Sequence, residues 1–130
     1  MSEENVEIVR RAYEAVSQRN FDAFLALHDA KVQLTPLRPE GATYHGHEGV
    51  RRYWEELFDV FPDFTAEIDE VRTLGNLVLV AARISGHGKG SEVPVGQPIW
   101  QLGEIRGGRV IWWRSYPSEA EALEAAGLSE

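Results

Sequence analysis

The stretch from Gly46 to Pro62 restricts the fold of this chain more than any other, because it combines a helical period with a heavy aromatic load. Apolar side chains recur at helical spacing on one face, and charged side chains occupy the other. Pro62 ends the helix, since proline cannot continue the hydrogen-bond ladder. An apolar stripe with four aromatic rings needs a broad partner surface, which a β-sheet provides. The stripe consists of Val50, Tyr53, Trp54, Leu57, Phe58 and Phe61.

Two shorter helices are predicted before this stretch. Ser2 can cap a first helix that runs to about Arg19, and Asn20 can cap a second helix from Phe21 to His28. Only one or two residues separate the two helices, which predicts a tight corner between them.

After Pro62 the hydrophobic period changes from 3.6 to 2, which indicates strands. Residues 64–69 alternate between apolar and polar, and Gly75-Asn76 is a two-residue hairpin signal. The run 77–82 is apolar on both faces, so we expect this strand to be covered on both sides. Further predicted elements are short strands at 32–35 and 43–45, a hairpin tip at 86–90, strands at 93–105 and 109–116, and a final helix between Ser118 and Gly127.

Helices that precede hairpin-linked strands predict an α+β fold, here as a single domain over residues 1–130. With 43% hydrophobic and 26% charged residues, the composition is that of a globular protein. The formal net charge of −8 disfavours nucleic acid and anionic membranes as partners, since both attract basic surfaces. The chain has no cysteine, no apolar leader and no apolar run long enough to span a membrane. We therefore expect a cytoplasmic protein with no membrane or nucleic-acid partner.

Five segments, in order along nearly the whole chain, carry a family pattern: 5–15, 20–27, 44–54, 107–110 and 121–128. With them the chain resembles the SnoaL-like branch of the nuclear transport factor 2-like superfamily. The resemblance implies a cone-shaped α+β fold, in which a curved antiparallel sheet wraps around a long helix. It also implies a deep pocket between the concave face and the first and third helices, and often a dimer through the outer face. Known members include polyketide cyclases, ketosteroid isomerases, scytalone dehydratase, limonene epoxide hydrolase and non-catalytic binding modules.

The catalytic residues of these enzymes have few counterparts in this chain. The ketosteroid isomerases place a carboxylate base before a proline at the end of the first strand, where this sequence has Thr35 before Pro36. Their protonated aspartate corresponds to Trp100, and their oxyanion tyrosine lies close to Tyr13. Two of the three roles are therefore absent, which disfavours isomerase chemistry by that mechanism.

His28 is the one candidate for a general acid or base, because the pKa class of histidine suits proton transfer near neutrality. The commoner alternative is a histidine whose ring bonds the last carbonyls of the second helix. His45, His47 and Glu48 suggest a metal site by residue type. Their spacing does not place both imidazoles on one side and supplies no fourth ligand, so we predict neither a metal nor a cofactor.

Trp112 and Trp113 are adjacent in the last predicted strand, so their side chains point to opposite faces. From the family alignment we expect Ile111, Trp113 and Ser115 to face inward. An exposed Trp112 beside Tyr116 would form an apolar patch of the kind that marks interfaces. This patch predicts a homodimer through the outer sheet face of Trp112, Arg114 and Tyr116.

The sequence thus predicts an aromatic-lined pocket for a small, largely apolar molecule. Three functions remain open: a cofactor-free cyclase, isomerase or dehydratase acting through His28; a non-catalytic binding or carrier module; and a structural dimer whose cone is filled by its own tryptophans. The candidate ligand-binding residues are Tyr13, Phe24, Gln33, Thr35, Trp54, Phe58, Trp100, Trp113 and Ser115.

Overall fold

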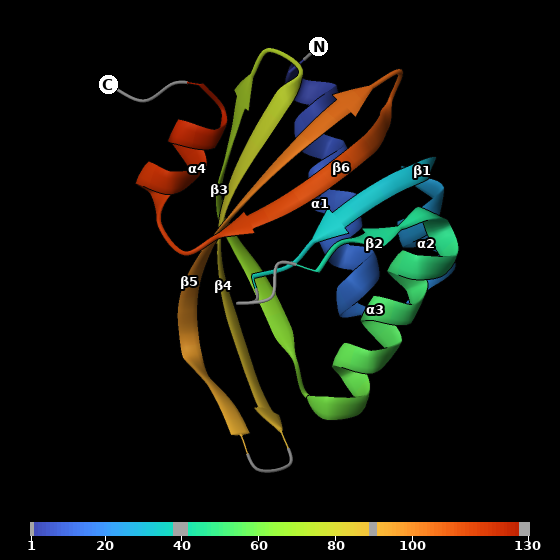
Figure 1. The fold of residues 1–130 in the computed structure, drawn as a ribbon, viewed down its shortest axis with the longest axis vertical. Coiled ribbons are helices and arrows are strands. Elements are labelled where there is room, and N and C mark those ends of the chain that lie inside the picture. Colours follow the sequence, from blue (N-terminus) through green and yellow to red (C-terminus); the bar gives the residue numbers. More distant parts are fainter. Residues whose placement is uncertain (1, 38–41, 89–90, 128–130) are drawn as a thin grey trace.

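The computed structural model describes residues 2–37, 42–88 and 91–127, in which helices pack against a curved six-stranded sheet (Figure 1). The helices are α1 (Ser2–Ser17), α2 (Phe21–Ala26), α3 (Gly46–Val60) and α4 (Glu119–Ala125). The strands are β1 (His28–Thr35), β2 (Tyr44–His45), β3 (Thr65–Leu74), β4 (Leu77–Gly88), β5 (Ser91–Arg106) and β6 (Arg109–Tyr116). This arrangement confirms the predicted α+β class. None of the described helices has the length and apolarity that a membrane crossing requires.

The strands lie in the order β2-β1-β6-β5-β4-β3, and long antiparallel hairpins form most of the sheet. Gly75 turns the β3–β4 hairpin at a φ of +68°, a conformation that glycine adopts without steric cost. β6 pairs with β1 in parallel, so the sheet is not antiparallel throughout. The predicted hairpin tip at 86–90 includes residues 89–90, and the connection after Leu37 includes residues 38–41, all of which lie outside the described residues.

The two faces of the sheet carry separate apolar clusters. Val78, Val80 and Ala82 of β4 pack on the side of α1, α2 and α3. Leu79, between them in sequence, faces the other way and packs with Ala122 of α4. The predicted second cover of this strand is therefore α4, a helix of the same chain. Its N-cap is the expected Ser118, whose hydroxyl accepts a hydrogen bond from the Glu121 N–H at 3.2 Å.

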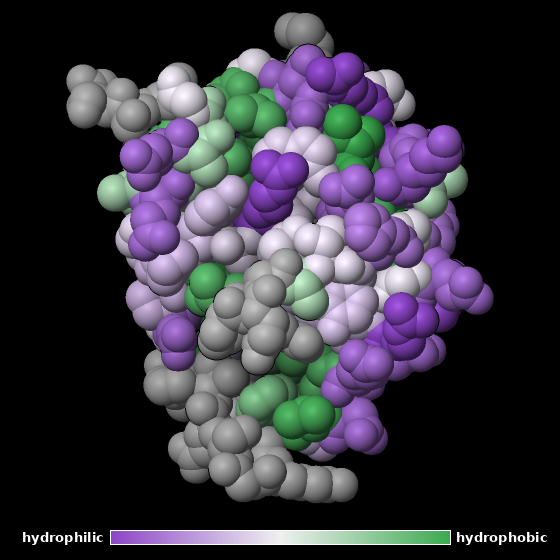
Figure 2. Space-filling view, in the orientation of Figure 1, coloured by the Kyte–Doolittle hydropathy of each residue, from purple (hydrophilic) through white to green (hydrophobic). Residues whose placement is uncertain are grey.

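The aromatic stripe of α3 faces α2 and the sheet and is half-buried, whereas its charged face meets solvent. Val50 is fully buried, and the Trp54 ring contacts the rings of Phe24 and Phe58 at centroid distances of 5.6 and 6.1 Å. Figure 2 shows hydrophilic side chains gathered over the outer side of α3, at the lower right of the view. The periodicity of this stretch thus fixes both the helix and its orientation.

The second helix ends two residues earlier than predicted, and His28 is the first residue of β1. The backbone of β6 causes the change, because the Val110 N–H donates to the Leu27 carbonyl at 3.0 Å and His28 pairs with Val110. Sheet pairing with a segment about eighty residues away therefore overrides the local helical pattern.

Candidate functional site

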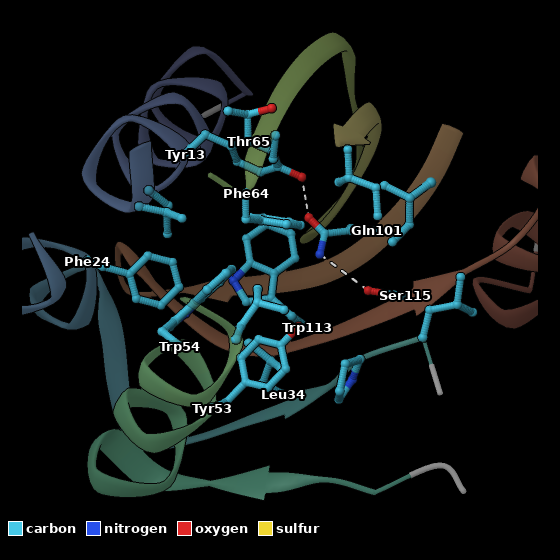
Figure 3. Close-up of a pocket in the computed structure, with 18 of the residues that line it drawn as sticks. Tyr13, Phe24, Leu34, Tyr53, Trp54, Phe64, Thr65, Gln101, Trp113 and Ser115 are labelled. Atoms are coloured by element: carbon cyan, nitrogen blue, oxygen red, sulfur yellow. Dashed lines mark hydrogen bonds between the residues drawn. The ribbon is translucent and has the colours of Figure 1, made fainter. Parts of the chain in front are cut away.

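A cavity of about 290 Å³ lies between α1, α3 and the concave face of the sheet (Figure 3). It is roughly twice the size of an engineered 150 Å³ cavity that holds benzene. Its walls are mainly apolar and come from α1, α2, α3 and the strands β1, β3, β4, β5 and β6, with the connections beside them. Seven aromatic residues line it: Tyr13, Phe24, Tyr53, Trp54, Phe61, Phe64 and Trp113.

Three polar side chains in the cavity wall are joined by hydrogen bonds, and we call them the polar chain. The Tyr13 hydroxyl donates to Gln101 Oε1, and Gln101 Nε2 donates to Ser115 Oγ at 3.3 Å (Figure 3). Burial raises the pKa of Tyr13 above its ordinary value, so the phenol stays neutral. Because Ser115 Oγ acts as an acceptor within the chain, its own O–H can donate to a ligand, and Tyr13 keeps lone pairs that can accept.

The electrostatics of the cavity are those of an uncharged site. None of the described residues that line it has a formally charged side chain. An ion inside it would lose its hydration without gaining a partner, which costs several kcal/mol or more. The Trp54 indole N–H is buried and has no hydrogen-bond partner among the described residues. Such a donor is costly to leave unpaired.

His28 lies behind the cavity wall and is fully buried. Its Nδ1–H donates to the Phe24 carbonyl at 2.7 Å, because a carbonyl can only accept. In this tautomer Nε2 is unprotonated, and it accepts the indole N–H of Trp113 at 2.9 Å. Burial lowers the pKa of His28 from 6.5 to about 4, so the ring is neutral at physiological pH. Both ring nitrogens are therefore engaged within the protein, and a proton-transfer role would require one of these bonds to open.

The structure brings some of the predicted ligand-binding residues together and separates others. Those that line the cavity are Tyr13, Phe24, Trp54, Trp113 and Ser115. The other four lie elsewhere: Gln33 is exposed, Thr35 bonds Thr43 at 2.9 Å, Phe58 stacks behind Trp54, and Trp100 packs in the outer cluster.

Sequence reasoning did not include Gln101, which joins the two hydroxyls of the polar chain. Side chains alternate along β5, so Gln101 faces the cavity and its neighbour Trp100 faces away. The one available signal was that alternation, since a glutamine inside a strand belongs to no motif.

The histidines whose residue type suggested a metal site also lie apart from the cavity. His47 Nε2 donates to the His28 carbonyl at 3.0 Å, and His45 is exposed at the start of α3. Within the described residues, no three histidine or carboxylate side chains gather closely enough to hold a metal ion.

On the outer face, Trp112 and Tyr116 pack in the cluster beneath α4. The Trp112 indole N–H donates to Glu104 Oε1 at 2.8 Å, and the guanidinium of Arg114 lies 4.4 Å from its ring centre. Trp113 and Ser115 line the cavity, as expected from the sequence. Ile111 was also expected to face inward, but Val110 takes the inner position instead, because the pairing with β5 shifts register between Glu104 and Ile105.

The model of a SnoaL-like domain matches residues 9–113, which is most of the chain. The chain belongs to the SnoaL-like family. No curated protein matches this SnoaL-like chain.

Solved structures share the fold of this SnoaL-like protein. A hypothetical protein with a ketosteroid isomerase-like fold from Catenulispora acidiphila, in complex with trimethylamine, is 25% identical, with a TM-score of 0.77 over 94% of this chain and 93% of that chain. A proposed polyketide cyclase from Sinorhizobium meliloti is 24% identical, with a TM-score of 0.71 over 85% and 94%. A nuclear transport factor 2-like protein of unknown function from Burkholderia pseudomallei is 20% identical, with a TM-score of 0.79 over 93% and 95%. The nuclear transport factor 2-like fold expected from the sequence is thereby confirmed.

Proposed function

We propose that this SnoaL-like protein binds a small, uncharged and largely apolar molecule in the cavity, without a cofactor. The observation that carries the proposal is an apolar hollow whose wall holds one neutral polar chain, Tyr13–Gln101–Ser115. Apolar walls with a few placed polar groups are typical of small-molecule sites.

The polar chain narrows the class of ligand. A carbonyl or hydroxyl oxygen could accept from Ser115, and a hydroxyl could donate to Tyr13. A carboxylate or ammonium group would find no counter-charge among the described lining residues. The ligand we propose is therefore an aromatic or alicyclic compound with a carbonyl or hydroxyl at one end.

The comparisons support small-molecule binding without naming the ligand. The similar protein from Catenulispora acidiphila is in complex with a small molecule, trimethylamine. The similar protein described as a proposed polyketide cyclase supports a second candidate, a cofactor-free cyclase, isomerase or dehydratase. In that candidate His28 would be the acid or base, and it would have to release Trp113 or Phe24 to act.

A matched pair of probes tests the binding proposal. We expect 2-naphthol to raise the melting temperature, because a ligand that binds only the folded state stabilises it. The anion 2-naphthoate, with the same rings, should leave the melting temperature unchanged. Equal shifts with both compounds, or none with 2-naphthol, would contradict the proposal.

A substitution separates binding from catalysis. Under either candidate, His28→Gln should still bind 2-naphthol. An enzyme that acts through His28 would lose its turnover in this variant, whereas a binding module has no turnover to lose. A substrate turned over by the wild type and not by this variant would favour the enzyme.

Three expectations stay predictions at this stage: a single domain over residues 1–130, a cytoplasmic location, and a homodimer through Trp112, Arg114 and Tyr116. Size-exclusion chromatography with light scattering at micromolar concentration tests the dimer. A monomeric mass would refute it.

A further inference from the structure

Two residues that do not line the cavity hold the indole of Trp113, which does. We propose that Gly103 and His28 are positioning residues that set the depth of the cavity through Trp113, and with it the largest ring system the cavity accepts. This inference rests on the proposed function, because ring size matters only if the cavity takes a ligand.

Gly103 provides the space behind the indole. It lies directly opposite Trp113 in the β5–β6 ladder. A Cβ atom at Gly103 would lie 2.7 Å from Cε3 and 2.9 Å from Cζ3 of Trp113, distances that real Cβ atoms essentially never show. It would also lie 3.1 Å from the Trp112 carbonyl oxygen, which is a tight contact but a milder one. Its φ lies outside the left-handed region, so the backbone does not require glycine there. The benzo edge of the indole therefore occupies the place of a side chain at position 103.

His28 holds the opposite edge of the same ring. Its Nε2 accepts the indole N–H at 2.9 Å, and its own orientation is fixed by the 2.7 Å bond from Nδ1–H to the Phe24 carbonyl. Its ring also stacks on the Phe24 ring at a centroid distance of 4.2 Å. His28 is fully buried and Trp113 is only 4% exposed, so solvent cannot replace this hydrogen bond.

The direction of any displacement follows from these contacts. The sheet backbone lies on one side of the indole and the cavity on the other. A side chain at position 103 must therefore push the benzo ring toward the cavity. In a cavity of about 290 Å³, a ring moved inward removes space that a second fused ring of a ligand would need.

A ligand-free measurement tests the inference first. In a crystal structure of Gly103→Ala, we expect the Trp113 indole to lie closer to Trp54 and the cavity to be smaller than in the wild type. Gly49→Ala is the matched control, because its Cβ would meet only Tyr44, at ordinary distances of 3.7 Å and more. An indole that keeps its wild-type position in Gly103→Ala would overturn the inference, whether or not any ligand binds.

A pair of probes then tests the size limit by isothermal titration. We expect Gly103→Ala to weaken 2-naphthol binding about tenfold or more and phenol binding less than about twofold, since one buried methyl group can produce such discrimination. Equal losses for both probes would overturn the size limit. If the wild type bound neither probe, the proposed function would fail, and the crystal structure would still decide the placement of Trp113.

Further variants test whether Gly103 and His28 act through Trp113. In a Trp113→Phe background, which removes the atoms of the indole nearest Gly103, Gly103→Ala should lower the melting temperature much less than in the wild-type background, with only the 3.1 Å contact to the Trp112 carbonyl oxygen left. A drop as large as in the wild-type background would show that Gly103 acts by another route and would overturn its role.

For His28, the Gln variant keeps an acceptor near the position of Nε2, and the Leu variant removes it. The indole N–H resonance of Trp113 should move less in His28→Gln than in His28→Leu. Equal shifts would overturn the positioning role of His28.

Discussion

Trp112 and Trp113 are neighbours in β6, yet their indoles contact different kinds of partner: charged side chains for Trp112 and a neutral histidine for Trp113. Trp113 faces the cavity, is 4% exposed and donates its N–H to a neutral histidine. Trp112 faces outward, is half-buried, donates to the carboxylate of Glu104 and carries Arg114 over its ring. The side chains are identical, so the difference lies in their surroundings.

The comparison shows how access to water selects the partner. Inside the cone a charged partner would be costly, and burial keeps His28 neutral by lowering its pKa. Outside, Arg114 is exposed, and the hydrogen bonds from Arg106 and Trp112 hold the pKa of the half-buried Glu104 below its usual range. The concave face is thus suited to an uncharged ligand, whereas the convex face keeps its charges in water.

The largest expected effect is the loss of the inner tryptophan. Trp113→Ala should lower the free energy of unfolding by about 3–5 kcal/mol, because it empties a buried site. Trp112→Ala should cost about 1–2 kcal/mol, because the ring is half-buried and its partners remain solvated. Urea denaturation measures both. Equal costs would show that the two faces do not differ as described.

The second effect is acid sensitivity from the inner face. The pKa of His28 is lowered from 6.5 to about 4, so between these values the unfolded chain binds a proton that the folded chain does not. Stability should therefore fall as the pH drops from about 6.5 to about 4, by about 3 kcal/mol in total, and this loss should end below that window. The measurement is the free energy of unfolding against pH.

His28→Gln is the control for this effect, since glutamine does not titrate. Its stability should fall less steeply than that of the wild type between pH 6.5 and 4. Parallel curves for the two proteins would exclude His28 as the source of the acid sensitivity.

The sequence predicted most elements of the fold because their signals are local. The stripe from Val50 to Phe61 specifies α3, Gly75-Asn76 specifies a hairpin, and β6 has the predicted bounds 109–116. His28 was assigned to a helix because its pairing with Val110, far along the chain, leaves no local trace.

The candidate site was harder to predict, because its polar chain joins residues 88 positions apart. Tyr13 and Ser115 were among the candidates, but Gln101 was not, and nothing near it in sequence indicates its partners. Gly103 did leave a signal, since a lone glycine inside a strand indicates a close approach by another group.

The third effect concerns the polar partners inside. Gln101→Leu should cost about 1–2 kcal/mol, because it leaves the buried Tyr13 hydroxyl without its acceptor. It should also weaken 2-naphthol binding, whereas Gln18→Leu, at an exposed position in the turn after α1, should leave binding unchanged. Unaltered binding in Gln101→Leu would show that the polar chain does not contribute to ligand binding.

The smallest effect is expected for the polar partner outside. Glu104→Gln keeps an oxygen that can accept from Trp112, but it removes the charge beside Arg106 and the second oxygen that accepts from Arg106 Nε. We expect a stability change of about 1 kcal/mol that shrinks in high salt, because the Arg106 end of the pair is largely exposed and water can replace its hydrogen bond. If Glu104→Gln lowered the free energy of unfolding as much as Gln101→Leu does, the polar partners on the two faces would not differ in the way described.

A crystal structure of the protein with 2-naphthol tests the central claim most directly. The account predicts density for the two rings inside the cavity, against Trp54 and Trp113, with the hydroxyl within hydrogen-bond distance of Tyr13 or Ser115. An empty cavity at a concentration that saturates binding in solution, or density only on the convex face, would contradict it.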